Sequence, residues 1–202
     1  MHNACMADIT DEIAASAAQC VVEEGLEYGP AKRRALKALG LPPKTPLPNN
    51  DQVEAQVREY IALFCADTQP AELLALRQHA LMWMQRLQDF RPYLGGAVWY
   101  GTATRLSDIY LQLFCDDEKS CEIELINKGV DFEARTVNGL HGEPVEALSI
   151  HSFCKALEEE IGVHLLIYEY DDVRGALKAD AQGRAPRGDA VAVQKLIEAQ
   201  SN

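Results

Sequence analysis

The fold of this chain is decided by the stretch Tyr93-Leu-Gly-Gly-Ala-Val-Trp-Tyr-Gly-Thr-Ala-Thr-Arg-Leu-Ser-Asp-Ile-Tyr-Leu-Gln-Leu-Phe114. From residue 108 onward it alternates between polar and apolar side chains, which predicts a half-buried strand. The two faces carry Ile109, Leu111 and Leu113 against Asp108, Tyr110 and Gln112. A carboxylate therefore opens the polar face of a strand, directly after a loop that contains glycine.

This arrangement resembles the nucleotidyltransferase superfamily typified by DNA polymerase beta and the small bacterial nucleotidyltransferases. The family signature is an apolar residue, Gly, then Gly or Ser, a short spacer, and a strand with carboxylates at positions i and i+2. The segment from Gly101 to Leu111 is similar to the family's glycine loop followed by Ser-Asp-Ile-Asp-Leu. Gly96 and Ala97 then take the place of the Gly-Ser step, or Gly95 and Gly96 after a shift of one residue. The resemblance covers residues 94 to 135.

The resemblance implies that backbone N–H groups of the glycine segments approach the phosphates of a nucleoside triphosphate. Hydroxyl groups would add hydrogen bonds, and Arg105 would offset phosphate charge. The phosphate-binding and nucleotide-binding candidates are Gly95, Gly96, Gly101, Thr102, Thr104, Arg105, Ser107 and Tyr110.

The family chemistry depends on carboxylates that hold metal ions. Two acids at i and i+2 on a strand lie about 6 to 7 Å apart and can flank two Mg²⁺ ions about 4 Å apart. Asp108 supplies the first acid, but Tyr110 stands at the second position. A phenol with a pKa of about 10 is neutral at pH 7 and is a poor ligand for Mg²⁺. The sequence thus lacks one metal-holding group.

The third carboxylate of the family lies on a neighbouring strand after a helix. Residues 116 to 128 have the pattern of that helix, and the next apolar-acid-apolar segment makes Asp131 the candidate, with Glu133 as its substitute. Asp108 and Asp131 are the candidate catalytic and metal-binding pair, which would hold Mg²⁺ weakly or not at all. Alternatively, Asp108 bonds the glycine loop and Asp131 is simply solvated. No organic cofactor is predicted.

The net charge limits the choice of partner. The chain of 202 residues has 19 basic and 31 acidic side chains, a formal net charge of −12 at pH 7. Such a surface repels phosphate backbones, so nucleic acid is not expected as a partner. The local exception is a basic helix face with Lys32, Arg33, Arg34 and Lys37, interpreted as solvated.

Segments that would take the chain out of the cytoplasm are not evident. No apolar run approaches the roughly 18 residues that cross a bilayer, and the first residues lack the basic and apolar regions of a signal peptide. The six cysteines are scattered without a Cys-x-x-Cys pair, as reduced buried thiols are. We therefore expect a cytoplasmic protein with no membrane contact.

The four prolines between Leu41 and Asn50 mark the main internal boundary. We predict an N-terminal helical hairpin and linker over residues 1–48, and a nucleotidyltransferase-like domain over 49–202. That domain is divided into helices (50–90), a sheet-containing core (91–170) and a C-terminal loop and helix (171–202), with a mobile loop over 178–188. The fold class is α+β, with a small mixed sheet of about four strands. A helix capped by Ser149 and a strand from Val163 belong to this expectation.

Three functions stay open from the sequence alone. The first is a degenerate nucleotidyltransferase-fold protein that binds a nucleotide or a protein and catalyses little or nothing. The second is an active metal-dependent enzyme that moves a nucleoside monophosphate to a hydroxyl or amine. The third is an adaptor whose acidic surface meets a basic protein partner.

Overall fold

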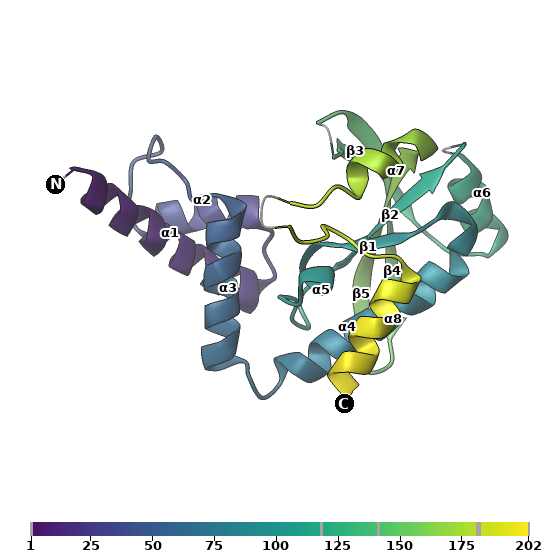
Figure 1. The fold of residues 1–202 in the computed structure, drawn as a ribbon, viewed down its shortest axis with the longest axis horizontal. Helices are drawn as coiled ribbons and strands as arrows, with labels where there is room; N and C mark the ends of the chain where they lie inside the picture. Colours follow the sequence, from purple (N-terminus) through teal and green to yellow (C-terminus); the bar gives the residue numbers. More distant parts are fainter. Residues whose placement is uncertain (1, 118, 141, 181–182, 202) are drawn as a thin grey trace. The chain divides into compact units, whose positions relative to one another are not determined.

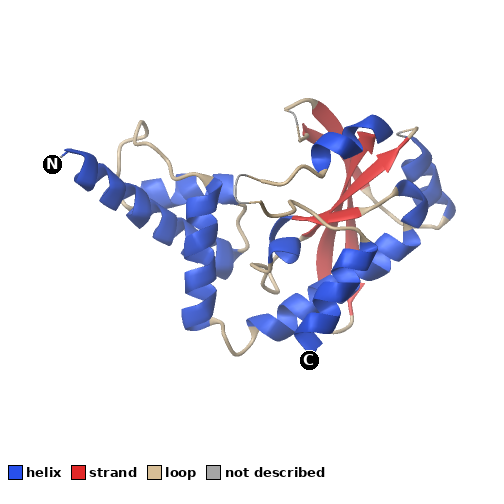
Figure 2. Cartoon of the chain, viewed as in Figure 1, coloured by secondary structure: helices blue, strands red, loops and turns tan. Residues whose placement is uncertain are grey.

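The computed structural model describes residues 2–117, 119–140, 142–180 and 183–201. The chain divides into two compact units, Met1–Pro70 and Ala71–Asn202. The first is helical and the second carries the sheet, as Figures 1 and 2 show by element and by colour. Within the described residues, no helix combines the length and the apolar character needed to cross a bilayer.

The helical unit contains α1 (His2–Glu24), α2 (Tyr28–Ala38) and α3 (Asn50–Phe64). Its core uses small and β-branched side chains, which let the helices approach closely: Ile13, Ala14, Ala17, Ala31, Ala35, Val53, Val57 and Ile61. Asn49 begins α3 with a capping box in which Asn49 and Gln52 bond each other's backbone N–H at 2.8 Å. The α3 helix packs in the first unit, against α1 and α2.

The second unit contains a mixed sheet, which confirms the predicted α+β class. Among the described residues it has five strands in the order β1-β2-β5-β4-β3. They are β1 (Tyr93–Gly95), β2 (Ile109–Cys115), β3 (Glu133–Asn138), β4 (Pro144–Cys154) and β5 (Glu159–Glu169). The β2 and β5 strands are parallel, and the other pairs are antiparallel. The strand predicted from residue 108 is confirmed, beginning at Ile109.

The expected helix beginning at Ser149 is wrong, because this segment forms β4 and its hairpin with β5. Apolar residues at 150, 153, 157 and 161 have the spacing of a helix face. The residues also alternate, and Leu148, Ile150 and Cys154 are buried on the core face. Pairing with β5 along the whole strand selects the alternating pattern, so the sheet has one strand more than expected.

Helices cover one face of the sheet. These are α4 (Gln69–Arg86) and α8 (Ala190–Ser201), which Figure 1 shows on the same side. The core between them and the sheet includes Leu76, Met84, Leu111, Leu148, Leu165, Val193 and Ile197. The Trp83 indole and the His79 ring both contact Ser152 Oγ on β4 at 2.9 Å, which fixes α4 on the sheet. Asp189 caps α8 by accepting a hydrogen bond from the Ala192 N–H at 2.8 Å.

The remaining helices lie at the ends of the strands. They are α5 (Gly96–Tyr100), α6 (Lys119–Asn127) and α7 (Val173–Ala176), with short 3-10 turns at Gln88–Phe90 and Tyr170–Asp172. On the face opposite α4, a small cluster of Phe114, Tyr168 and Ala176 covers the end of β2 that is far from Asp108. The other end of this face has half-buried and exposed side chains. We call this end of the face, which carries Tyr110, Ser149 and His164, the open face.

Candidate functional site

One row of paired residues crosses the open face from edge to edge. Strand pairing joins Gly95 to Tyr110, Tyr110 to His164, His164 to Ser149, and Ser149 to Glu133. Directly paired residues project to the same face of a sheet. The row therefore sets a phenol, an imidazole, a hydroxyl and a carboxylate side by side.

Asp108 precedes β2 and turns toward this row. Its Oδ2 lies 3.1 Å from His164 Nε2, and His164 Nδ1 lies 2.9 Å from Ser149 Oγ. A carboxylate only accepts hydrogen bonds, so a neutral imidazole with its proton on Nε2 and Ser149 donating to Nδ1 satisfies both contacts. Gly162 makes room for the acid, since a Cβ there would meet Asp108 Oδ1 at 2.5 Å. The carboxylate is thus held between β2 and β5.

Tyr110 stacks on the same imidazole. The two ring centroids are 4.8 Å apart with an interplanar angle of 31°. Gly96 lies at the edge of the phenol ring, where an added Cβ would be 3.8 Å from Cδ2, and its φ of +67° favours glycine. The Gly95-Gly96 pair and strand β2, which the sequence resemblance placed in one motif, are therefore in contact.

The structure does not bring Asp131 beside Asp108. Asp131 precedes β3, and β5 and β4 separate β3 from β2. Three strand spacings amount to roughly 14 Å. Glu133, the substitute, is in the same row as Tyr110 but at that same remove, and it is exposed and paired with Arg135 at 2.6 Å. The residue that lies beside Asp108 on the neighbouring strand, β5, is His164.

These side chains do not fit a pair of Mg²⁺ ions. Mg²⁺ prefers oxygen ligands, above all carboxylates, in a near-octahedral set. The groups that meet on the open face are one carboxylate, one phenol and one imidazole, and the imidazole already takes an oxygen of Asp108. Within the described part of the chain, no three His, Cys, Asp or Glu side chains gather to hold a metal ion.

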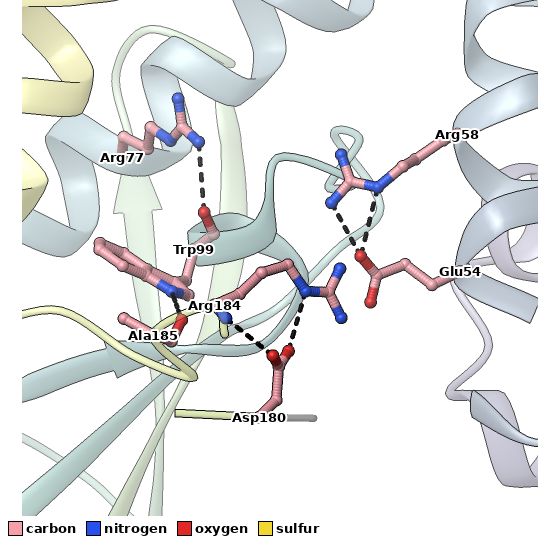
Figure 3. A network of polar contacts seen from close by, with 7 residues as sticks. All are labelled: Glu54, Arg58, Arg77, Trp99, Asp180, Arg184 and Ala185. Carbon is pink, nitrogen blue, oxygen red and sulfur yellow. Dashed lines mark hydrogen bonds and ion pairs between the residues drawn. The ribbon is translucent and has the colours of Figure 1, made fainter. Parts of the chain in front are cut away.

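Helix α4 anchors the start of the loop that contains Gly101 through hydrogen bonds to the backbone of α5. Arg77 on α4, which is buried, donates from Nε to the Val98 carbonyl and from Nη2 to the Trp99 carbonyl (Figure 3). Gly101 ends α5 with a φ of +84°, which permits the sharp exit from the helix. The loop toward β2 therefore starts from a fixed point.

The hydroxyl and basic candidates of this loop have different surroundings. Ser107 Oγ accepts from the Thr104 N–H at 3.0 Å, so it shapes the loop. Thr102 and Thr104 are 3% and 5% exposed, and their hydroxyls point to no hydrogen-bond partner among the described residues. Arg105 is exposed and forms an ion pair with Glu159, which raises the pKa of its guanidinium.

Sequence reasoning did not assign His164 to the site. It placed this residue only within the strand from Val163, because local alternation does not show which strand lies next to β2. The chain from β2 to β5 passes through α6, β3 and β4, so the sequence carried no local signal for the parallel pairing of β2 and β5. Ser149 was missed for a related reason, since it was assigned to a helix.

Among solved structures, the chain is similar to a cytoplasmic RNA terminal U-transferase, with 16% identity, a TM-score of 0.36, and coverage of 54% of this chain and 36% of that chain. It is also similar to Cid1 in complex with the UTP analog UMPNPP, with 13% identity, a TM-score of 0.34, and coverage of 56% and 36%. A third similar structure is the MgGTP-bound Cid1 poly(U) polymerase, with 13% identity, a TM-score of 0.34, and coverage of 56% of this chain and 38% of that chain.

The chain spans little more than a third of the length of each of these structures. Likeness at these TM-scores carries no inference about function. No protein-family model and no curated protein matches the chain.

Proposed function

We propose that this chain is a nucleotide-binding protein with a nucleotidyltransferase-like sheet whose catalytic centre is degenerate. The observation that carries this proposal is the contact of His164 with Asp108, at 3.1 Å, in the place where a second strand would supply an acid. An imidazole that donates to the carboxylate withdraws it from a cation. The site therefore retains the glycine segment but lacks the additional carboxylates that would hold metal ions beside Asp108.

The open face keeps features that suit a nucleotide. Tyr110 and His164 form an aromatic pair, and stacking of a base on an aromatic side chain contributes about 1 to 3 kcal/mol. Gly96 is exposed and leaves the backbone at the end of β1 accessible next to that pair, whereas Gly95 is buried. A nucleotide with its base at the rings and its phosphates toward the glycines uses both features.

The test measures binding and transfer separately. The full chain is titrated calorimetrically with ATP and with UTP, with and without Mg²⁺, and incubated with the labelled nucleotides and Mg²⁺ or Mn²⁺. We expect binding that changes little when the metal is left out, and no transfer. Metal-dependent transfer that disappears in Asp108→Asn would refute the proposal in favour of an active enzyme.

A matched pair of variants assigns the binding to the open face. Tyr110→Ala removes the ring that His164 stacks on, and we expect nucleotide affinity to fall roughly tenfold, as a loss of about 1.4 kcal/mol implies. Tyr170→Ala removes an exposed tyrosine that contacts Arg91 instead, and should leave affinity unchanged. Equal affinity in both variants places the nucleotide elsewhere. If neither nucleotide binds, the proposal is refuted in favour of a protein partner, the alternative that the sequence left open.

A further inference from the structure

The segment before α8 extends the row of the open face beyond β1. Leu94 and Gly188 form an antiparallel bridge, with N–H to carbonyl distances of 2.8 and 3.0 Å in the two directions. In antiparallel pairing, one step along each segment in opposite directions sets Arg187 across from Gly95. A Cβ built on Gly95 would be 4.0 Å from the Pro186 carbonyl, which agrees with this register. Arg187 thus stands at the end of the row that contains Tyr110 and His164.

Side-chain alternation places the Arg187 side chain on the sheet face opposite α4, where its guanidinium interacts with Tyr168 of the Phe114, Tyr168 and Ala176 cluster. Leu94 is fully buried in the core between the sheet and α4, so its neighbours in sequence face the other way. The position across from Leu94, Gly188, packs against the Trp99 ring. The Trp99 indole donates to the Ala185 carbonyl at 2.8 Å, which holds this segment along β1 and α5 (Figure 3).

Arg187 is a buried charge that forms no ion pair with any described acidic side chain. Its exposure is 9%, and its Nε and Nη1 atoms have no hydrogen-bond partner within the part of the chain that is described. Burial lowers the pKa of the guanidinium, and the groups that oppose this are the phenols of Tyr168 and Tyr100, which are neutral at pH 7. An arginine is still charged there, and leaving it buried and unpaired costs several kcal/mol.

A second buried polar atom lies on the same face of the sheet, on β2. The Oε1 atom of Gln112 is buried and, among the described residues, has no partner. The Gln112 amide nitrogen approaches the Gly95 Cβ position to 3.6 Å, so this side chain leans over the same glycine that Arg187 faces. Oxygen and nitrogen of an amide exchange places by a half-turn, so the group can offer N–H to an anion.

We infer that Arg187 forms, with Gln112 and the glycine segment, the subsite that binds a phosphate group of the nucleotide on the open face. A guanidinium presents two N–H groups in a planar fork that matches two oxygens of a phosphate. Gly95 is buried beneath the Gln112 side chain, so a diphosphate or triphosphate in the subsite reaches the aromatic pair only where this amide turns aside. This inference deepens the proposed function. It rests on that proposal for the binding of a nucleobase to the aromatic pair, whereas phosphate binding at Arg187 can be tested without it.

The experiment uses sodium pyrophosphate as the probe, because it has the phosphates without a base or sugar. Calorimetry compares the parent chain with Arg187→Met, which keeps an unbranched apolar stem without the guanidinium, and Arg187→Lys, which keeps the charge without the fork. Arg184→Met is the matched control, since it removes one charge from the same segment at a side chain already paired with Asp180 at 2.8 Å. We expect pyrophosphate affinity to fall roughly 10- to 100-fold in the Met variant, less in the Lys variant, and hardly at all in the control.

Thermal unfolding separates binding from a structural role. Without an anion, Arg187→Met should unfold at the same or a higher temperature than the parent chain, because an unpaired buried charge is removed. Pyrophosphate should raise the melting temperature of the parent chain and of Arg184→Met only. An Arg187→Met chain that binds pyrophosphate as tightly as the parent, or a parent chain that binds no pyrophosphate, overturns the inference.

The failure of this inference and that of the proposed function give different results. If ATP and UTP bind no more tightly than pyrophosphate, and Arg187→Met loses all three, the phosphate subsite stands and the nucleotide proposal fails. If ATP or UTP binds well and Arg187→Met leaves that affinity unchanged, the nucleotide proposal stands and the subsite fails.

Discussion

Replacing Gly188 by alanine tests whether the segment before α8 lies along β1 as described. A Cβ at this position would be 2.2 Å from Trp99 Cζ3 and 2.3 Å from Cη2. Carbon atoms in contact rest about 3.5 to 4.0 Å apart, so the ring must retreat by roughly 1.3 to 1.8 Å. A shift of that size is enough to break the 2.8 Å hydrogen bond from the indole to the Ala185 carbonyl.

The expected destabilisation follows from three terms. Overpacking costs about 1 to 3 kcal/mol, and loss of the hydrogen bond about 0.5 to 1.5 kcal/mol. The smaller conformational freedom of alanine in the unfolded chain returns about 0.4 to 1 kcal/mol. The net loss is roughly 2 kcal/mol of unfolding free energy, which lowers the melting temperature of a unit of this size by about 8 °C.

Tryptophan fluorescence is the suitable assay, because Trp83 and Trp99 both belong to the second unit. The control is Gly29→Ala in α2, where a Cβ meets only Arg33 at an ordinary 3.7 Å, and the fluorescence midpoint should not move. Trp99→Phe removes the ring atoms that the new methyl strikes. The double variant should therefore be more stable than the sum of the two single changes predicts.

Two results would refute this description of the segment. One is a Gly188→Ala chain within about 0.5 kcal/mol of the parent, the size of an ordinary surface substitution. The other is a double-mutant cycle without coupling, which means that the ring and the glycine are not in contact. Either result also removes the register that places Arg187 opposite Gly95.

Three further outcomes are expected. Tyr110→Asp combined with His164→Asp restores carboxylates beside Asp108 and should create Mn²⁺ binding detectable by calorimetry, whereas absence of binding in a folded variant contradicts the account of why the centre is degenerate. Burial lowers the pKa of His79 below its ordinary value of about 6.5, so the unfolded chain takes up the proton first. Stability of the second unit should fall as the pH drops below about 6.5, and His79→Gln should reduce that fall; an unchanged pH profile speaks against a buried neutral ring. Burial raises the pKa of Cys121 to about 12, so iodoacetamide at pH 8 should label half-buried Cys65 and spare Cys121 in the native chain, as peptide mass spectrometry can check.

The sequence by itself determined the elements whose patterns are local. The alternation from Asp108 specified β2, the pattern of residues 116 to 128 specified α6, and the segment from Val163 specified most of β5. A strand face or a helix cap depends on residues only a few positions apart in the sequence, so the sequence alone is enough to recognise it.

Tertiary structure alone decided which side chains meet. The parallel pairing of β5 with β2 sets His164, and not Asp131, beside Asp108, and the Leu94 bridge brings Arg187 to the same row from nearly a hundred residues away. A strand pattern states that a segment can pair, but not with which partner or in which register. That choice is made by the burial of all the strands and helices together, so the site at their junction is a property of the fold.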